Sequence, residues 1–118
     1  MIPYGRQDIS QSDIDAVTKV LGSDYLTQGP IIEKFESSIA TNVGASFAAV
    51  VNSATSALHL ACLALGLRKG DSLWTTPITF VASANCALYC GAKVDFVDID
   101  INTYNMSVKS LEEKLKTA

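Results

Sequence analysis

Two long stretches of this chain, residues 37–67 and 72–92, contain no Asp, Glu, Lys or Arg. By length and hydropathy either could be mistaken for a membrane span. However, Ser, Thr, Asn, Gly and Pro interrupt both stretches at intervals typical of turns between strands and helices. We therefore expect both stretches to form a core buried within protein, and we expect no membrane as a partner.

The composition of the chain indicates one globular unit. Its 118 residues are 48% hydrophobic and 18% charged, which is enough apolar material to bury a core. The formal net charge is −3, and the nine Lys and Arg residues form no cluster. A scattered charge of this sign argues against nucleic acid as a partner.

The three cysteines, Cys62, Cys86 and Cys90, each fall within an apolar helical pattern. No His or carboxylate is spaced to complete a metal site with them, so we expect three reduced, buried thiols and no bound metal. An odd cysteine count fits a cytoplasmic protein, as does the lack of an apolar signal segment in the first nine residues.

The amino-terminal part, residues 1–45, has the pattern of a helical segment. Ser10 or Ser12 can cap a helix that continues to about Leu21, where Gly22 follows. Residues 26–30 break the chain, and residues 31–42 form a second amphipathic pattern that Gly44 ends.

From residue 46 to 118 the pattern changes to alternating strands and helices. The predicted elements are strands over 47–51, 72–76 and 93–99, and helices over 54–67, 80–90 and 107–116. This order is the signature of successive βαβ units, so the fold class is α/β with a mostly parallel sheet. The helix over 54–67 is apolar nearly all round and is expected to be buried, and Val94, Phe96 and Val97 are expected to enter the core. The last helix lacks a following strand or cap, which suggests a fragment boundary.

A turn rich in hydroxyls, residues 52–58, follows the first predicted strand. In a parallel sheet such a turn lies at the carboxyl edge, where the free amides of a helix start can hold a phosphate. Ser53 could equally act only as a helix cap. The segment lacks both the G-x-G-x-x-G dinucleotide fingerprint and the Gly-Lys-Ser/Thr of a P-loop.

A second strand-to-helix turn covers residues 75–80 and ends in Phe80. Taken alone, Phe80 fits a core position better than a binding platform. Because both turns are expected at the same edge of one sheet, however, its ring could stack on a flat heteroaromatic group held by the first turn.

Other polar residues have simpler interpretations. His59, the sole histidine, lies within an apolar helix and is expected in a hydrogen-bonded core or interface position. Asp95, Asp98 and Asp100 alternate at a strand end, where we expect them to face solvent and to bind no metal.

Four segments in order, YLTQGP, NSATSALHLA, TTPITFVASAN and GAKVDFVDID, together resemble a known family. They are similar to the pyridoxal-phosphate (PLP) dependent nucleotide-sugar aminotransferases of the DegT/DnrJ/StrS type, and most of all to those of pseudaminic acid biosynthesis. The resemblance implies the large domain of the aspartate-aminotransferase-like fold and a homodimer with active sites at the subunit interface. It also implies transfer of an amino group from glutamate to C4 of a UDP-linked 4-keto-6-deoxy-N-acetylhexosamine.

The resemblance also implies roles for individual residues. Ala54 and Thr55 would bind the PLP phosphate with Ser56 beside them, and Phe80 would cover one face of the pyridine ring. The residues implied to line the nucleotide-sugar site are Tyr4, Asp24, Tyr25, Leu26 and Thr27.

The catalytic lysine of the family, which binds PLP covalently, and the acid that pairs with the pyridine nitrogen would follow Ala118. None of the chain's lysines lies in a matching motif. We therefore expect no catalytic residue in these 118 residues and no activity from them alone, although the full-length parent would be an enzyme.

Two alternatives remain open. Superfamily members that carry His in place of the lysine dehydrate sugars instead of aminating them. The chain could also be a non-catalytic α/β domain that binds a phosphate or a partner protein.

Overall fold

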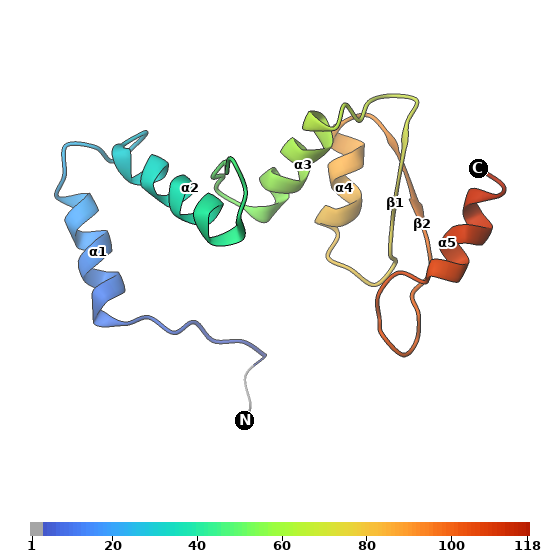
Figure 1. Ribbon diagram of the computed structural model, residues 1–118, viewed down its shortest axis with the longest axis horizontal. Coiled ribbons are helices and arrows are strands. Elements are labelled where there is room, and N and C mark those ends of the chain that lie inside the picture. Colours follow the sequence, from blue (N-terminus) through green and yellow to red (C-terminus); the bar gives the residue numbers. More distant parts are fainter. Residues whose placement is uncertain (1–3) are drawn as a thin grey trace. The chain divides into compact units, whose positions relative to one another are not determined.

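The computed structural model describes residues 4–118 and divides the chain into two compact units. The first ends at Val50, and the second runs from Val51 to Ala118 (Figure 1).

The first unit contains two helices, α1 (Gln11–Leu21) and α2 (Pro30–Val43), as the sequence predicted. At the start of α1, Ser10 and Asp13 form a capping box, and the hydrogen bonds from Ser10 lower the pKa of Asp13. Gly44 ends α2 in the left-handed conformation at φ 69°, which favours glycine.

The predicted strand over residues 47–51 does not form, and that prediction is wrong for this structure. A strand needs a hydrogen-bonded neighbour, and the pairing described below involves two other segments. Instead, the amide of Val50 donates to Glu36 Oε1 at 2.9 Å, so a side chain takes the place of a ladder partner. Phe47 is 90% exposed.

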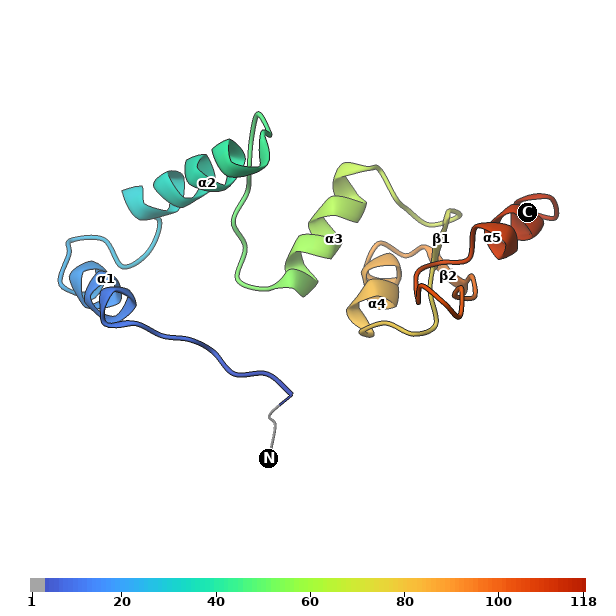
Figure 2. The same ribbon diagram turned by 60° about the horizontal axis from the view of Figure 1, so that its bottom comes forward.

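The second unit is built around a βαβ unit. Its elements are α3 (Ala54–Ala64), β1 (Ser72–Thr75), α4 (Ala82–Tyr89), β2 (Lys93–Phe96) and α5 (Val108–Leu115). β1 and β2 pair in parallel with Leu73 opposite Val94, and Val97 N–H donates to Thr75 O at 2.9 Å beyond the last pair. α3 and α4 lie on one side of the strands and α5 on the other (Figures 1 and 2). The predicted α/β class with a parallel sheet is confirmed.

The core of this unit lies where α4 packs against α3 and both strands. Its buried side chains are Cys62, Ala82, Cys86, Ala87, Ala92 and Val97. Burial of Val97 was predicted correctly, and Val94 is half-buried, but Phe96 is 48% exposed. Val94 and Phe96 point to the same face of β2, so alternation does not separate them; Phe96 is the last residue of the strand and is only partly covered.

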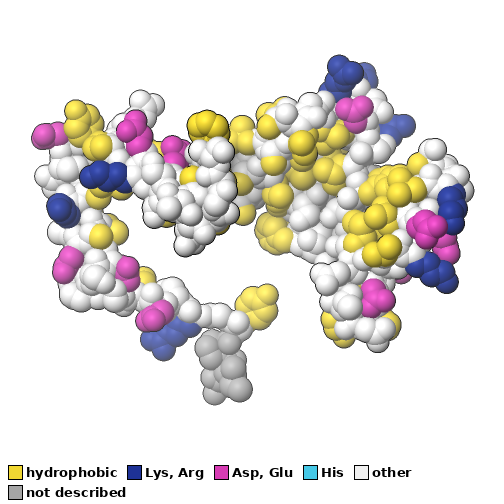
Figure 3. Space-filling view, viewed as in Figure 1, with side chains coloured by type: hydrophobic (Ala, Val, Ile, Leu, Met, Phe, Trp, Pro, Cys, Tyr) yellow, Lys and Arg dark blue, Asp and Glu magenta, His cyan; other side chains and the backbone are white. Residues whose placement is uncertain are grey.

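The predicted burial of the first helix of this unit is also wrong. Leu60 and Leu63 of α3 remain 49% and 50% exposed, because α4 covers one side of the helix and leaves the other open. Figure 3 shows apolar side chains gathered over this part of the chain.

The three cysteines are free thiols, as predicted. Cys62 and Cys86 are buried, whereas Cys90 is only partly buried, so the expectation of full burial fails for Cys90. Burial, followed by the neighbouring thiols Cys86 and Cys90, raises the pKa of Cys62 to about 11, and the thiol is therefore neutral at physiological pH.

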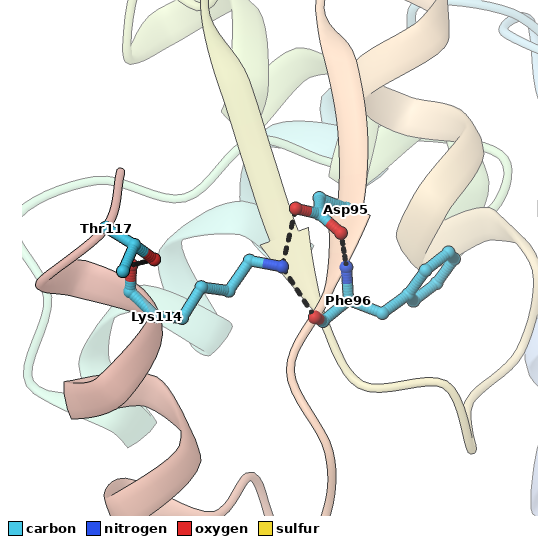
Figure 4. A network of polar contacts seen from close by, with 4 residues as sticks. All are labelled: Asp95, Phe96, Lys114 and Thr117. Carbon is cyan, nitrogen blue, oxygen red and sulfur yellow. Dashed lines mark hydrogen bonds and ion pairs between the residues drawn. The ribbon is translucent and has the colours of Figure 1, made fainter.

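One lysine fastens α5 to the strands. Lys114 Nζ forms an ion pair with Asp95 and donates to Phe96 O at 2.9 Å (Figure 4). It also lies 5.2 Å from the centre of the Trp74 ring. Trp74 and Asp95 are partners in the strand register, so they share the face of the sheet that the Lys114 side chain reaches from α5. The hydrogen bond from Lys114 lowers the pKa of Asp95, which was expected only to face solvent.

Among residues 4–118, no helix combines the length and the apolar character needed to cross a bilayer.

We predict that Asp95→Asn loosens α5. The pKa of Asp95 is lowered in the folded state, so its contribution is present above the unfolded pKa of about 3.9 and is lost as the pH falls through the folded value. Hydrogen exchange of the α5 amides in the full-length protein should therefore be faster in the variant near pH 7, and the difference should vanish once the pH falls below the folded pKa of Asp95.

The matched control is Glu112→Gln, which breaks the exposed pair between Glu112 and Lys116 within α5. Surface pairs of this kind contribute little, so exchange should hardly change. Equal effects of the two variants would contradict the role assigned to Asp95.

Candidate functional site

The first part of the candidate site is the amino-terminal turn of α3. Ser53 is its N-cap, and Ser53 Oγ accepts the amide of Ser56 at 3.2 Å, while Ser53 O accepts the amide of Ala57 at 3.1 Å. Within residues 4–118, the amides of Ala54 and Thr55 donate to no protein group. Two adjacent N–H groups at the positive end of a helix are suited to bind an anion.

The hydroxyl groups of this turn fall into two classes. Ser56 donates to Asn52 Oδ1 at 3.0 Å and lies 3.0 Å from Ser53 Oγ, so both serines are engaged locally. Thr55 is half-buried, and its hydroxyl has no hydrogen-bond partner in the described part of the chain. The turn therefore offers two amides and one hydroxyl to a phosphate, all from Ala54 and Thr55.

The second part is the turn that leads into α4. Phe80 is 75% exposed, which is high for a large aromatic side chain and leaves its ring free to stack on a ligand. The side chains of Thr79 and Ser83 pair at 3.1 Å across the helix start, and Val81, the N-cap residue, gives no side-chain hydrogen bond. The interpretation of Phe80, taken by itself, as a core residue is therefore wrong for this structure.

The two turns lie on the same edge of the second unit. β1 and β2 both end at this edge, and α3 and α4 both begin there (Figures 1 and 2). No Lys or Arg occurs in residues 37–67, so the first turn would hold a phosphate with neutral donors and the helix dipole. Its donor set fits the phosphate group of a cofactor such as PLP.

The residues predicted to line a nucleotide-sugar site belong to the first unit. Tyr4 is fully exposed, and residues 24–27 connect α1 to α2. Ser23 Oγ fixes this connection by accepting the amide of Tyr25 at 3.3 Å and donating to Tyr25 O at 3.1 Å. A Cβ at Gly29 would lie 2.6 Å from Tyr25 Cβ, so only glycine fits there. The sugar-binding role of these residues stays a prediction.

Polar residues outside the two turns have local partners. Asp98 accepts the amide of Ile99 at 2.8 Å, and Asp100 accepts those of Asn102 and Thr103 at 2.9 and 3.0 Å. The hydrogen bond from Thr103, then that from Asn102, lowers the pKa of Asp100. No group of three potential metal ligands comes together within residues 4–118.

His59 is half-buried in α3, and its ring meets the ring of Tyr89 edge-on at 5.4 Å between centroids. This contact links α3 to α4 and agrees with a packing role.

Two residues with clear roles escaped the sequence analysis. No side-chain role was predicted for Asn52, yet its Oδ1 accepts a hydrogen bond from Ser56 in the α3 turn. No contact was predicted for Lys114, yet it reaches Asp95 and Phe96. An Asn two positions before a predicted helix was a signal from which the role of Asn52 could have been found. Nothing in the spacing of residues 95 and 114 indicated the contact between Lys114 and Asp95.

Comparison with known proteins places this geometry in a family. The model of the DegT/DnrJ/EryC1/StrS aminotransferase family matches residues 7–118. The chain belongs to this family. A UDP-4-amino-4,6-dideoxy-N-acetyl-beta-L-altrosamine transaminase of Campylobacter jejuni is 51% identical over 115 residues, which cover 98% of this chain and 30% of that protein.

Solved structures agree with this assignment. A sugar aminotransferase from Streptococcus pneumoniae, in its PLP form, superposes with a TM-score of 0.89 at 30% identity over 95% of this chain and 29% of its own. The E. coli GDP-4-keto-6-deoxy-D-mannose-3-dehydratase with bound hydrated PLP gives a TM-score of 0.87 at 30% identity, over 94% of this chain and 30% of its own. The chain thus spans about a third of the length of the family members it matches.

We predict that Ser53→Ala destabilises the start of α3 by about 1 kcal/mol, because the amide of Ser56 loses its acceptor. Ser53→Thr keeps an acceptor oxygen and should lose much less. The thermal midpoint of the full-length protein, with and without bound cofactor, measures both effects, and equal losses for Ala and Thr would rule out the capping role.

Proposed function

We propose that this chain is the amino-terminal part of a PLP-dependent aminotransferase that transfers an amino group from glutamate to C4 of a UDP-linked 4-keto-6-deoxy sugar. The observation that carries the proposal is the pair of free amides at Ala54 and Thr55, on the same sheet edge as the exposed ring of Phe80. Family membership supports the reaction class. The name of the Campylobacter jejuni relative supports a UDP-linked 4-amino-6-deoxy sugar as the product, which is in keeping with pseudaminic acid biosynthesis.

The residues of the second unit would bind and orient the cofactor. The amides of Ala54 and Thr55, with the Thr55 hydroxyl, would hold the phosphate of PLP, and Phe80 would cover one face of its ring. When bound, PLP supplies an electron sink for reactions at the carbon that carries the amine.

The residues of the first unit would serve the second substrate. We propose that they line the nucleotide-sugar site of the assembled enzyme: Tyr4, Asp24, Tyr25, Leu26 and Thr27. The exposure of Tyr25 and Leu26, 59% and 66%, supports their availability to a ligand. In this scheme residues 1–45 form a helical segment, and residues 46–118 form the first part of the PLP-binding large domain of a cytoplasmic homodimer.

The catalytic lysine would come from a part of the protein outside these 118 residues. Lys114 contacts Asp95 and Phe96 on the face of the sheet opposite α3 and α4. Neither turn of the candidate site contains a lysine. The 118-residue chain alone should therefore transfer no amine from glutamate to a keto-sugar.

The half-reaction with glutamate tests the proposal directly. The full-length protein loaded with PLP should release one equivalent of 2-oxoglutarate per active site when it is given glutamate and no sugar, because the amino group stays on the enzyme. Failure of the loaded enzyme to release 2-oxoglutarate would refute the aminotransferase.

We predict that Phe80→Ala weakens PLP binding by about three- to tenfold, because the ring loses its stacking partner. Fluorescence titration of the apoenzyme measures this affinity. Phe35→Ala is the matched control, since Phe35 is a half-exposed phenylalanine within α2 and belongs to neither turn, and it should leave the affinity unchanged.

A second candidate is a PLP-dependent sugar dehydratase, which the similarity to the E. coli dehydratase favours. Such an enzyme would carry His in place of the lysine. Mass spectrometry after borohydride reduction separates the two, since only the lysine enzyme keeps PLP covalently bound.

A further inference from the structure

We infer that Asn52 is a positioning residue for the cofactor phosphate, and that it acts by holding Ser56 away from that phosphate. The inference rests on the proposed function and refines the donor set of the same site. It starts from three hydrogen bonds that link Asn52, Ser53 and Ser56 at the start of α3.

Each serine hydroxyl has one proton to donate, and the contacts determine where both protons go. Ser56 donates to Asn52 Oδ1 at 3.0 Å. In the 3.0 Å contact between the two hydroxyls, Ser53 must then be the donor and Ser56 the acceptor. Ser53 Oγ still accepts the amide of Ser56 at 3.2 Å, so the three groups form one directed chain that ends on Asn52.

This chain leaves neither serine with a proton for a phosphate. The amide of Ser56 is also used, so in this scheme Ser56 contributes no donor to the site. The donors that remain are the amides of Ala54 and Thr55 and the hydroxyl of Thr55. Asn52 thus selects the phosphate ligands of a turn in which three consecutive positions, 54–56, are candidates.

An amide side chain suits this position better than a carboxylate would. Residues 37–67 contain no Lys or Arg, so no nearby cation from this segment could offset a negative charge beside the phosphate. Asn accepts the Ser56 hydroxyl as Asp would, without that charge.

The test compares the PLP dissociation constant of full-length apoenzyme variants. Thr55→Val removes a hydroxyl that donates to a charged group, and it should raise the dissociation constant about tenfold or more. Ser56→Ala, alone or combined with Asn52→Ala, should raise it by a smaller factor, about threefold, because both break the chain without freeing the Ser56 hydroxyl. Asn52→Ala alone releases that hydroxyl, so its effect should differ from that of the double variant. Thr55→Ser keeps the hydroxyl and should restore most of the affinity.

The phosphorus NMR resonance of bound PLP supplies a readout that a purely structural role would not move. It should shift in Thr55→Val, which loses a ligand hydroxyl, and in Asn52→Ala, where the released Ser56 hydroxyl can reach the phosphate. It should stay in place in Ser56→Ala and in the double variant. A loss of affinity in Ser56→Ala as large as that in Thr55→Val would overturn the inference. Independent, multiplying effects of Asn52→Ala and Ser56→Ala would overturn it as well.

These outcomes are distinct from failure of the proposed function. If the unaltered full-length protein binds no PLP, the proposed function itself is refuted. If it binds PLP but Ser56→Ala loses as much affinity as Thr55→Val, only the role of Asn52 is refuted. Ser56→Ala introduces a strong helix former, so its comparison with Thr55→Val decides the matter even if Asn52→Ala does not fold.

Discussion

The parallel pairing of β1 with β2 is the constraint on which the rest of the second unit depends. Parallel strands cannot be joined by a tight turn, so the chain must return along one face, and α4 makes that return. The return places the start of α4 where β1 ends. Since α3 packs beside α4 in the same direction, its start lies at that edge too (Figures 1 and 2). One pairing thereby brings two helix starts together.

Hydrogen bonding within the α3 turn then decides what that edge can bind. Ser53 Oγ accepts the amide of Ser56, and the chain of hydrogen bonds that ends on Asn52 satisfies both serine hydroxyls. The donors left over belong to Ala54 and Thr55. The donors that this turn can offer to an anion are thus set as much by the groups that are already satisfied as by those that are free. On the opposite face, Lys114 holds α5 to β2 and takes no part in this site.

The exposed apolar surface follows from the same architecture. Two strands and three helices leave one side of α3 uncovered, and Leu60 and Leu63 remain half-exposed there. The family members that this chain matches are about three times as long. A doubly covered parallel sheet needs further strands and helices to bury such positions, which explains why an all-round apolar helix is only partly buried in this chain.

The sequence by itself determined the helices, the two paired strands and the residues of the phosphate turn, because caps, glycine stops and apolar periodicity act over a few neighbouring residues. It also indicated the family, through four short segments in a fixed order. Tertiary structure alone decided that residues 47–51 form no strand, that Phe96 is exposed and Phe80 free, and that Lys114 reaches Asp95. These outcomes depend on which distant segments are present to pair or pack, and local sequence patterns do not specify those segments.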